Sequence, residues 1–251
     1  MRGVLNLNPT AFTIFGIPIQ WYGILIASGV LIGGIIALKA AERKGVSEDT
    51  MLDLLIFAVP LSIIGARIYY VVFSWDYYKD NPIEALNFRG GGMAIHGAII
   101  MAVLVTLIFC KIKNQNFWVI ADIAAPSLIL GQAIGRWGNY INQEAYGRPT
   151  DLPWGIMIDG VKVHPTFLYE SLWNFLVFGF LLWFSRNKSE TDGEVFLWYL
   201  ILYSFIRFFI EGLRTDSLMW GPIRVAQLVS VLSIALAAFI LYRKKQREKL
   251  A

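Results

Sequence analysis

Seven apolar segments, each about as long as a bilayer is thick, dominate this chain of 251 residues. A helix needs ~20 mostly apolar residues to cross the hydrocarbon core of a membrane. Only 16% of the residues are charged, against about 25% in a soluble domain, and 57% are hydrophobic. The sequence therefore predicts an all-α, polytopic membrane protein with about seven transmembrane helices. We place them at residues 17–40, 50–73, 91–110, 117–137, 166–185, 194–212 and 225–242.

Basic residues are unevenly shared between the two sides of these segments, and this predicts the orientation of the chain. One side has twelve basic residues in short segments: Lys39, Arg43, Lys44, Lys111, Lys113, Arg186 and Lys188 in its loops, and Arg243, Lys244, Lys245, Arg247 and Lys249 in the C-terminal tail. The opposite side has fewer basic residues in longer segments: Arg2, Lys79, Arg89, Arg148, Lys162, Arg214 and Arg224. The positive-inside rule places the C-terminus in the cytoplasm and the N-terminus outside. We expect one domain, residues 1–251, whose longest loop forms a small extracytoplasmic cap at about residues 138–165.

The composition argues against several classes of function. The single cysteine, Cys110, excludes an internal disulfide, and with only two histidines a metal site is not expected. The glycines at residues 90–92 are not followed by Gly-Lys-Ser/Thr, so they do not form a nucleotide loop. Lys and Arg residues lie between apolar segments and not on one face, and this does not favour a nucleic-acid-binding function. We expect no cofactor.

Ionisable side chains inside the predicted spans are unusual, because a charge is costly in a membrane. We expect most of them in the outer halves of six helices: Tyr22, Arg67, His96, Arg136, Glu170, Tyr203, Arg207 and Glu211. His96 is expected about 8 Å below the outer end of its span. Asp53 and Asp122 fall near cytoplasmic ends, where hydration would explain them. The convergence predicts a polar cavity open to the outer leaflet or the outside water, and interhelical ion pairs are the alternative.

Two motifs contribute most of these polar residues. Tyr203, Arg207 and Glu211 are four residues apart and therefore lie on one face of a helix. An arginine there suits a phosphate, with Glu211 orienting it; an ion pair without a ligand is the alternative. The second motif is the exit of the fourth span, Gly135-Arg-Trp-Gly-Asn-Tyr-Ile-Asn-Gln-Glu144, which is too rich in polar residues for a simple loop.

At these positions the chain resembles the bacterial prolipoprotein diacylglyceryl transferases, over essentially its whole length. The segment from Gly135 to Glu144 is similar to the family's signature. Further matches are Tyr22-Gly23, Gly92-Met-Ala-Ile-His-Gly97, His164-Pro-Thr-Phe-Leu-Tyr-Glu170, and Tyr203 with Arg207 and Glu211.

The resemblance implies a reaction at the outer leaflet of the bacterial cytoplasmic membrane. The diacylglyceryl group of phosphatidylglycerol passes to the lipobox cysteine of a preprolipoprotein, a thioether forms, and glycerol phosphate leaves. It is the first step of lipoprotein maturation. The implied partners are therefore phosphatidylglycerol, preprolipoprotein signal peptides and the lipid bilayer.

The resemblance also implies roles for particular residues. Arg136 and Arg207 are candidates for a cationic clamp on the phosphate. His96 is a candidate base for the thiol, with Glu211 and Glu144 as alternatives, although His96 could equally be a buried hydrogen-bonding residue. The remaining positions are expected to bind substrate or to shape its site: Tyr22, Tyr203 and Asn139 by hydrogen bonds to the headgroup, Glu144 by orienting Arg136, and Gly147 by shaping the cap.

Three other functions compete with this interpretation. A transporter needs a polar path to the cytoplasm, and the inner halves of the spans offer little polar lining. A membrane protease of the serine or aspartyl type is disfavoured, because neither Gly-x-Ser-x-Gly nor Gly-x-Gly-Asp occurs in a span. A lipid-binding protein without chemistry is the third, and a turnover assay distinguishes it from an enzyme.

Overall fold

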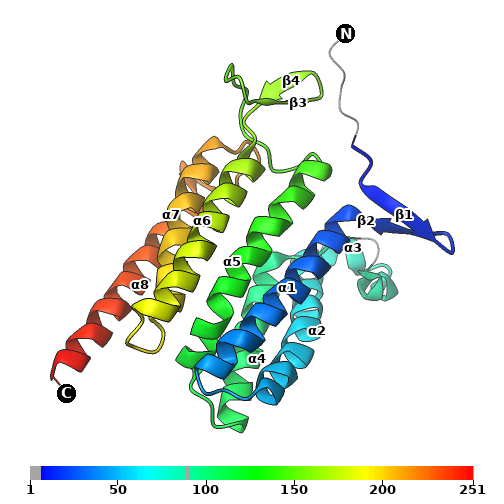
Figure 1. The fold of residues 1–251 in the computed structure, drawn as a ribbon. Coiled ribbons are helices and arrows are strands. Elements are labelled where there is room, and N and C mark those ends of the chain that lie inside the picture. The colour runs from blue at the N-terminus through cyan, green and yellow to red at the C-terminus, as the bar shows by residue number, and fades with distance from the viewer. Residues whose placement is uncertain (1–6, 89–90, 251) are drawn as a thin grey trace. The chain divides into compact units, whose positions relative to one another are not determined.

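The computed structural model describes residues 7–88 and 91–250. Within these ranges seven helices are long and apolar enough to cross a membrane, as judged by length and composition (Figure 1). They are α1 (Trp21–Arg43), α2 (Glu48–Phe73), α4 (Ile95–Ile112), α5 (Phe117–Ile141), α6 (Thr166–Asn187), α7 (Glu194–Leu213) and α8 (Val225–Leu250). The predicted all-α polytopic membrane fold is confirmed. Arg2 and Arg89, used to predict the orientation, lie outside the described residues.

The chain divides into two compact units. The first comprises Met1–Ala37 and Ala121–Ala251, and the second comprises Leu38–Ile120. The first unit thus contains most of α1 and α5 together with α6, α7 and α8. The second contains α2 and α4. Our expectation of one domain with an outer cap stays a prediction.

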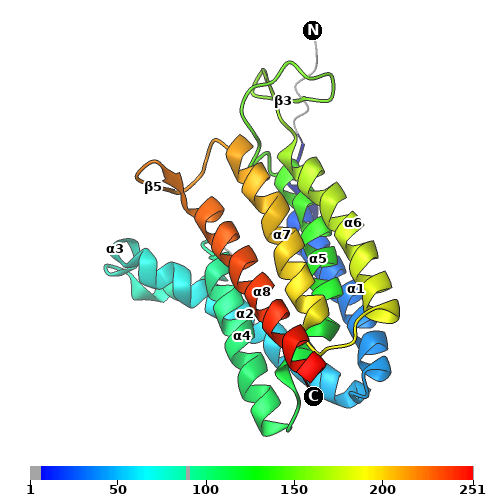
Figure 2. The ribbon, with the colours of Figure 1, turned by 90° about the vertical axis from the view of Figure 1, so that its left-hand side faces the viewer.

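The core of the first unit forms where α5, α6 and α7 run side by side (Figure 1), and α7 lies between α6 and α8 (Figure 2). Each of the three helices contributes apolar side chains at helical spacing, and this excludes lipid and water from their common interior. The buried members are Ala125, Ile129, Val177, Leu181, Val195 and Tyr199. This apolar core separates the two ends of the unit.

Small residues allow α1 and α5 to approach closely within the first unit. A Cβ atom added to Gly29 would lie 3.3 Å from the Cα of Gly131. One turn further along α1, the Ser127 hydroxyl of α5 donates a hydrogen bond of 2.7 Å to the carbonyl of Gly33. Small residues at a helix interface are the usual means by which membrane helices gain packing contacts.

Asp122 is not a hydrated residue near a helix end, as we expected, but a buried cap. Asp122 is only 2% exposed. Its two oxygens accept hydrogen bonds from the backbone N–H groups of Gly193, at 2.7 Å, and Phe196, at 2.9 Å. These N–H groups belong to the start of α7, where they have no partner inside the helix. A carboxylate at this position satisfies them and complements the helix dipole.

The first span begins later than predicted, because residues 17–20 form a strand. Strand β1 (Thr10–Ile14) pairs with β2 (Ile17–Gln20), and Ile14 lies opposite Ile17. The two-residue turn consists of Phe15 and Gly16, both with positive φ, as in a type I′ hairpin turn. A short apolar strand joined directly to an apolar helix reads as one continuous run. Tyr22 is consequently the second residue of α1 and lies closer to the start of the helix than a span beginning at residue 17 would place it.

Two further hairpins lie in the first unit. Strands β3 (Ile156–Ile158) and β4 (Val161–Val163) pair within the predicted cap segment around an Asp159-Gly160 turn, in which both residues have positive φ. Strands β5 (Met219–Trp220) and β6 (Ile223–Arg224) lead directly into α8. Helix α8 itself continues past residue 242, where we placed the end of the span, to Leu250.

In the second unit, α2 and α4 pack through glycines. A Cβ atom added to Gly65 would lie 2.8 Å from the carbonyl oxygen of Gly97, and one added to Gly97 would collide with the carbonyl of Gly65 and with Tyr69. Near the opposite end of the helices, Lys113 forms an exposed ion pair of 2.8 Å with Asp53. The glycine contact therefore sets how closely these two helices can approach.

Arg67, which the sequence marks as an unusual charge, organises the connection between α2 and α4. This connection contains the short helix α3 (Trp75–Tyr78) and the 3-10 helix η1 (Pro82–Leu86). Arg67 is 4% exposed. Its guanidinium donates to four backbone carbonyls at 2.6–3.0 Å, those of Glu84, Ala85, Gly91 and Gly92. It also lies 5.2 Å from the ring centroid of Tyr78. Arg67 therefore stabilises the connection by hydrogen bonds to its main-chain carbonyls.

The third span also begins later than predicted, at Ile95 in place of residue 91. Gly91 and Gly92 have φ values of +80° and +74°, which a right-handed helix does not accommodate. His96 is therefore in the first turn of α4, and not about 8 Å below its outer end as predicted. Its ring centroid lies 6.0 Å from that of Tyr69 on α2.

The glycine contact between α2 and α4 yields a test of packing. Gly97→Ala is expected to destabilise the protein by about 1–3 kcal/mol, because the added methyl group must displace backbone or Tyr69. The measurement is the thermal unfolding midpoint in detergent, followed by tryptophan fluorescence. Gly179→Ala on α6 is the matched control, since a Cβ there meets nothing within 4 Å. Equal midpoints for the two variants would contradict the proposed packing role.

Candidate active site

Three helices of the first unit bring four charged side chains together near the end at which α5 stops and α6 starts. Arg136 lies in the last turns of α5, and Glu170 lies one turn into α6. Arg207 and Glu211 are four residues apart on α7, so they share one face of that helix. The sequence predicts their common depth because α5 and α7 run in the direction opposite to α6. We call Arg136, Glu170, Arg207 and Glu211 the ion cluster.

The carboxylate of Glu170 forms the centre of the ion cluster. Its Oε1 lies 2.6 Å from Nη2 of Arg136, and its Oε2 lies 3.6 Å from Nη1 of Arg207. Arg207 in turn places Nη2 2.7 Å from Oε2 of Glu211. The two carboxylate side chains are 2% and 4% exposed, whereas the two arginines are 20% and 19% exposed. The anions are thus buried and the cations remain partly accessible.

The contacts leave hydrogen-bonding capacity on one of the cations. Within the described residues, Nη1 of Arg207 is buried and makes no hydrogen bond, although it lies at ion-pair distance from Glu170. A guanidinium presents its donors in a planar fork that matches phosphate oxygens. Arg207 therefore retains a donor for an anionic ligand.

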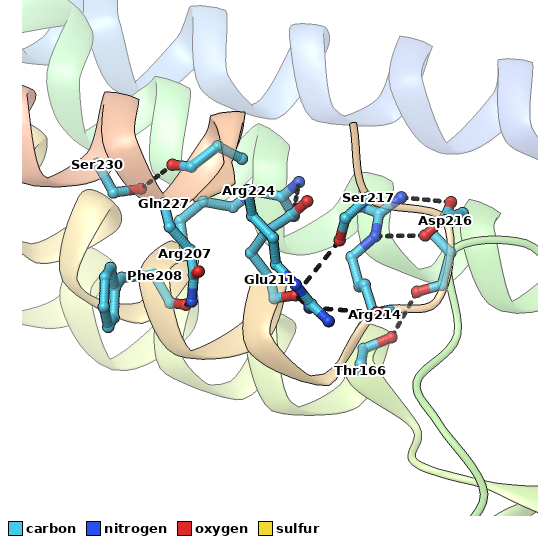
Figure 3. Close-up of polar contacts among 12 residues, drawn as sticks. Thr166, Arg207, Phe208, Glu211, Arg214, Asp216, Ser217, Arg224, Gln227 and Ser230 are labelled. Atoms are coloured by element: carbon cyan, nitrogen blue, oxygen red, sulfur yellow. Dashed lines mark hydrogen bonds and ion pairs between the residues drawn. The ribbon is translucent and has the colours of Figure 1, made fainter. Parts of the chain in front are cut away.

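Glu211 is fixed from two directions. Its side chain pairs with Arg207, and its backbone carbonyl accepts a hydrogen bond from Nη1 of Arg224 (Figure 3). The same Arg224 nitrogen donates to the carbonyl of Arg214 at 3.2 Å. Arg224 belongs to β6, just before α8, so it holds the open carbonyls at the C-terminal end of α7. This contact fixes the end of the helix that carries Arg207 and Glu211.

A chain of hydrogen bonds leads from Arg136 to the segment after α5. Nη1 of Arg136 donates to Oδ1 of Asn139 at 3.3 Å, and Nδ2 of Asn139 donates to Oε1 of Glu144 at 2.7 Å. The polarity of both bonds is fixed, because an arginine can only donate and a carboxylate can only accept. Asn139 therefore links the Glu144 carboxylate to the Arg136 guanidinium through hydrogen bonds. The predicted grouping of these three residues agrees with the geometry.

Gly147 lies where the segment after α5 meets the start of α6. Its N–H donates to the carbonyl of His164 at 3.0 Å, and a Cβ added to it would lie 2.7 Å from the Cβ of His164. Gly147 also forms an isolated bridge with Arg214, and the next residue, Arg148, donates to the carbonyl of Leu213 at 2.8 Å. Glycine here permits a close backbone approach that ties the predicted cap to the end of α7.

Tyr22 and Tyr203 are the aromatic members of the predicted site. A Cβ added to Gly138 would collide with the ring of Tyr22, so this glycine on α5 makes room for the tyrosine on α1. Tyr203 lies one turn before Arg207 on α7 and stacks on Tyr199, with ring centroids 6.0 Å apart. Tyr22 thus packs against α5, and Tyr203 packs against Tyr199 on its own helix.

A small pocket opens beside the ion cluster on the first unit. Eight residues from α5, the predicted cap, α6 and α7 line it: Arg136, Asn139, Ala145, Thr166, Phe167, Glu170, Ile210 and Arg214. Thr166 anchors one wall, because its hydroxyl donates to the carbonyl of Ala145 at 2.6 Å. The pocket therefore combines two arginines and the Glu170 carboxylate with an amide and an apolar wall, and it is too small to enclose a water molecule.

Two charged lining residues, Glu170 and Arg214, are not among the predicted catalytic or substrate-binding residues. The sequence marks Glu170 only as an unusual charge and as the end of the motif that starts at His164, and its partners on two other helices cannot be read from spacing along the chain. Arg214 was counted only as a loop residue. A signal for Arg214 does exist, since it follows Arg207 and Glu211 by seven and three residues and so continues their stripe.

Arg214 is held by Asp216 outside the membrane-spanning segment. Its Nε and Nη2 donate to the two Asp216 oxygens at 2.8 and 2.7 Å (Figure 3). These hydrogen bonds from Arg214 lower the pKa of the Asp216 carboxyl below its ordinary value, although burial acts in the opposite direction. The same pairing raises the pKa of Arg214. Arg214 therefore stays charged at the mouth of the pocket.

His96 belongs to the second unit. The first unit brings together the other predicted site residues: Tyr22, Arg136, Asn139, Glu144, Gly147, Tyr203, Arg207 and Glu211. The assignment of these residues to catalysis and substrate binding stays a prediction.

Seven membrane-spanning helices and a buried cluster of arginines and carboxylates define a multi-pass membrane protein with a site suited to an anionic lipid. The profile of the family described as prolipoprotein diacylglyceryl transferase matches residues 9–243, and the chain belongs to that family. The predicted resemblance, and with it the prediction of a transferase, is confirmed.

Relatives from several bacteria cover nearly the whole chain. A protein of Finegoldia magna is 54% identical over 96% of this chain and 97% of its own length. One from Clostridioides difficile is 53% identical over 98% and 99%, and one from Listeria welshimeri is 51% identical over 97% and 92%. All three carry the name phosphatidylglycerol–prolipoprotein diacylglyceryl transferase.

The position of Glu170 predicts a large loss of stability when its charge is removed. Glu170→Ala is expected to lower the free energy of unfolding by about 3–5 kcal/mol, because it removes a buried carboxylate shared by two partly buried arginines. Chemical denaturation in detergent micelles measures this. Asp53→Ala is the control, since it breaks an ion pair of similar length that is 44% exposed on each side and contributes at most about 1 kcal/mol. Similar losses for both variants would exclude a central role of Glu170.

The Asp216 pair predicts a pH dependence with a defined sign. A carboxyl whose pKa is lower in the folded state stabilises the protein above its unfolded pKa and loses this contribution as the pH falls through the folded pKa. The difference in unfolding midpoint between the native chain and Asp216→Asn should therefore be full above about pH 5. It should shrink below the ordinary aspartate value of 3.8. Because Asp216 is 53% exposed, the effect stays below about 1 kcal/mol. A difference that grows toward acid pH would contradict the pairing.

Proposed function

We propose that this chain transfers the diacylglyceryl group of phosphatidylglycerol to the lipobox cysteine of preprolipoproteins. The cysteine sulfur attacks the glyceryl carbon that bears the phosphate, and a carbon–sulfur bond forms. The carbon–oxygen bond to the phosphate breaks, and glycerol phosphate leaves with the bonding electrons. The thiol proton passes to a base of the protein. The product is a thioether-linked lipoprotein precursor, and this is the first step of lipoprotein maturation.

The pair of arginines bridged by Glu170 is the observation that supports this proposal most directly. The phosphate is anionic in the substrate and gains charge as the carbon–oxygen bond breaks. Fixed cations in a site with little water stabilise that developing charge without having to reorganise. Arg136 and Arg207 are partly exposed and rigidly spaced, and Nη1 of Arg207 retains a donor. They are the residues that we assign to the leaving phosphate.

The activation of the thiol requires a base or a positive field, because a free thiol has a pKa of ~8.5 and is mostly protonated at neutral pH. Glu211 is engaged with Arg207, and Glu144 accepts a hydrogen bond from Asn139. His96 lies on α4 of the second unit, with its ring 6.0 Å from that of Tyr69. We keep His96 as a candidate base, with Glu211 and Glu144 as the alternatives.

The same proposal places the chain in the cytoplasmic membrane of a bacterium. The N-terminus lies outside and the basic C-terminal end of α8 lies in the cytoplasm. The end of the first unit that carries the ion cluster then faces the outer leaflet, where phosphatidylglycerol and the exported signal peptide meet. The partners are thus the bilayer, phosphatidylglycerol and the preprolipoprotein.

The inner part of the first unit favours an enzyme over a transporter. Below the ion cluster, α5, α6 and α7 pack through apolar side chains that include Ile129, Val177 and Leu181. A transporter requires a polar path across such a layer, whereas a transferase needs access from one side only. This packing supports a reaction at the outer surface.

A transfer assay tests the proposed function. Purified protein in detergent receives phosphatidylglycerol and a lipobox peptide, with a Cys→Ala peptide as control. The Cys peptide should gain the mass of a diacylglyceryl group while glycerol phosphate is released. Arg136→Ala should lower the rate at least ~100-fold, as expected for the loss of a group that stabilises transition-state charge. Lipid binding without any modified peptide, by a folded protein, would reject the enzyme.

A further inference from the structure

Two carboxamide side chains, Asn174 and Gln132, lie between the ion cluster and the apolar core of the first unit. On α6, Asn174 lies one turn beyond Glu170 and one turn before the core residue Val177. On α5, Gln132 lies one turn before Arg136 and follows the core residue Ile129. The helical repeat therefore places Gln132 and Asn174 at the same level and on the faces that meet α7. We call these two residues the carboxamide layer.

The carboxamide layer contains polar atoms without partners. Asn174 is 0% exposed, and within the described residues neither its Oδ1 nor its Nδ2 makes a hydrogen bond. Gln132 donates from Nε2 to the Tyr199 hydroxyl at 2.9 Å, but its buried Oε1 has no partner among the same residues. Buried polar groups in proteins are almost always hydrogen-bonded, since an unpaired group loses its hydration without compensation.

Two neighbouring side chains on α6 are engaged in hydrogen bonds, unlike the carboxamides. Ser171, on the same helix, donates to the carbonyl of Ala133 at 2.9 Å and accepts a hydrogen bond from Trp137 at 3.1 Å. Trp173, next to Asn174, donates to the carbonyl of Leu202 at 3.0 Å. Within the described residues, the other buried atoms without a hydrogen bond belong either to the ion cluster or to residues nearer the opposite end of the unit, which are Ser189, Thr191 and Trp198. The two carboxamides are thus the uncharged side chains with unpaired atoms directly below the arginines assigned to the phosphate.

We propose that Asn174 and Gln132 form a hydroxyl-binding site that recognises the glycerol headgroup of the lipid; this rests on the function proposed above. A headgroup glycerol has two hydroxyl groups, which can donate to Oδ1 of Asn174 and Oε1 of Gln132 and accept from Nδ2 of Asn174. Both carboxamides are neutral, so they offer no compensation for an ammonium headgroup. They lie one helical turn, about 5.4 Å, below the clamp that holds the phosphate. Bound water is the other ligand that offers the same hydrogen-bonding groups.

Two lipids of equal charge distinguish headgroup hydroxyls from water as the ligand of this site. Phosphatidylglycerol and phosphatidylpropanol share the phosphodiester and the three-carbon headgroup, and they differ only in the two hydroxyl groups. The native chain should prefer phosphatidylglycerol in kcat/KM by about tenfold or more, since a site built for a hydroxyl discriminates against its absence. Asn174→Leu should bring this ratio close to one by raising KM for phosphatidylglycerol, while the rate with phosphatidylpropanol is unchanged.

The unfolding midpoint is recorded for the same variant, because it separates a ligand site from a structural role. Leucine removes unpaired polar atoms from an apolar environment, so Asn174→Leu should keep or raise the midpoint. Gln132→Met, which removes the acceptor on α5, should shift the lipid ratio in the same direction. Asn187→Leu makes the same kind of change at the exposed end of α6 and should leave both the ratio and the rates unchanged.

The results with the two lipids and the unfolding midpoint together identify the ligand of the carboxamide layer. Loss of the preference at an unchanged midpoint assigns the site to the headgroup. Equal loss with both lipids at an unchanged midpoint assigns it to water held for the reaction. Native rates and ratio in Asn174→Leu, or a fall of both rates together with the midpoint, would overturn the proposal. Absence of any transfer by the native chain would instead refute the proposed function, so the two failures remain distinguishable.

Discussion

The carboxylate of Glu170 lies between two guanidinium groups, and much of the first unit depends on this arrangement. Two arginines at this separation would repel each other strongly where water is scarce, and the shared anion offsets that repulsion. Because Arg136, Glu170 and Arg207 belong to α5, α6 and α7, the same contact also fixes three helices relative to each other. The spacing of the two cations is therefore a property of the helix packing, and the chemistry that we propose relies on it.

Polarity falls in steps along the interior of the first unit. The ion cluster is followed by the carboxamide layer and then by the apolar core at Ile129 and Val177. Such a gradient suits a substrate whose parts differ in the same order, from a charged phosphate to a neutral headgroup. It also closes the inner half of the unit, which agrees with a reaction that uses substrates from one side of the membrane.

The sequence predicts the spans well, because runs of ~20 apolar residues have few alternatives to a membrane helix. It fails at their ends, since neither the strand at residues 17–20 nor the turn at Gly91 and Gly92 interrupts the apolar run. Arg207 and Glu211 can be paired from their spacing along one helix. The bridging role of Glu170, the capping role of Asp122 and the unpaired atoms of Asn174 arise from contacts between helices, which periodicity in a single segment does not specify.

Arg67 illustrates a consequence of binding to main chain instead of side chains. Its guanidinium is satisfied by carbonyls of Glu84, Ala85, Gly91 and Gly92, a group that every amino acid supplies. Mutations at positions 84 and 85 leave these acceptors in place, so the contacts with Arg67 require no particular side chain at either position. Arg67 has no such freedom, because a lysine cannot present several donors in a planar fork. Constraint in this connection is thus concentrated in one side chain and in the glycines that shape the path of the backbone.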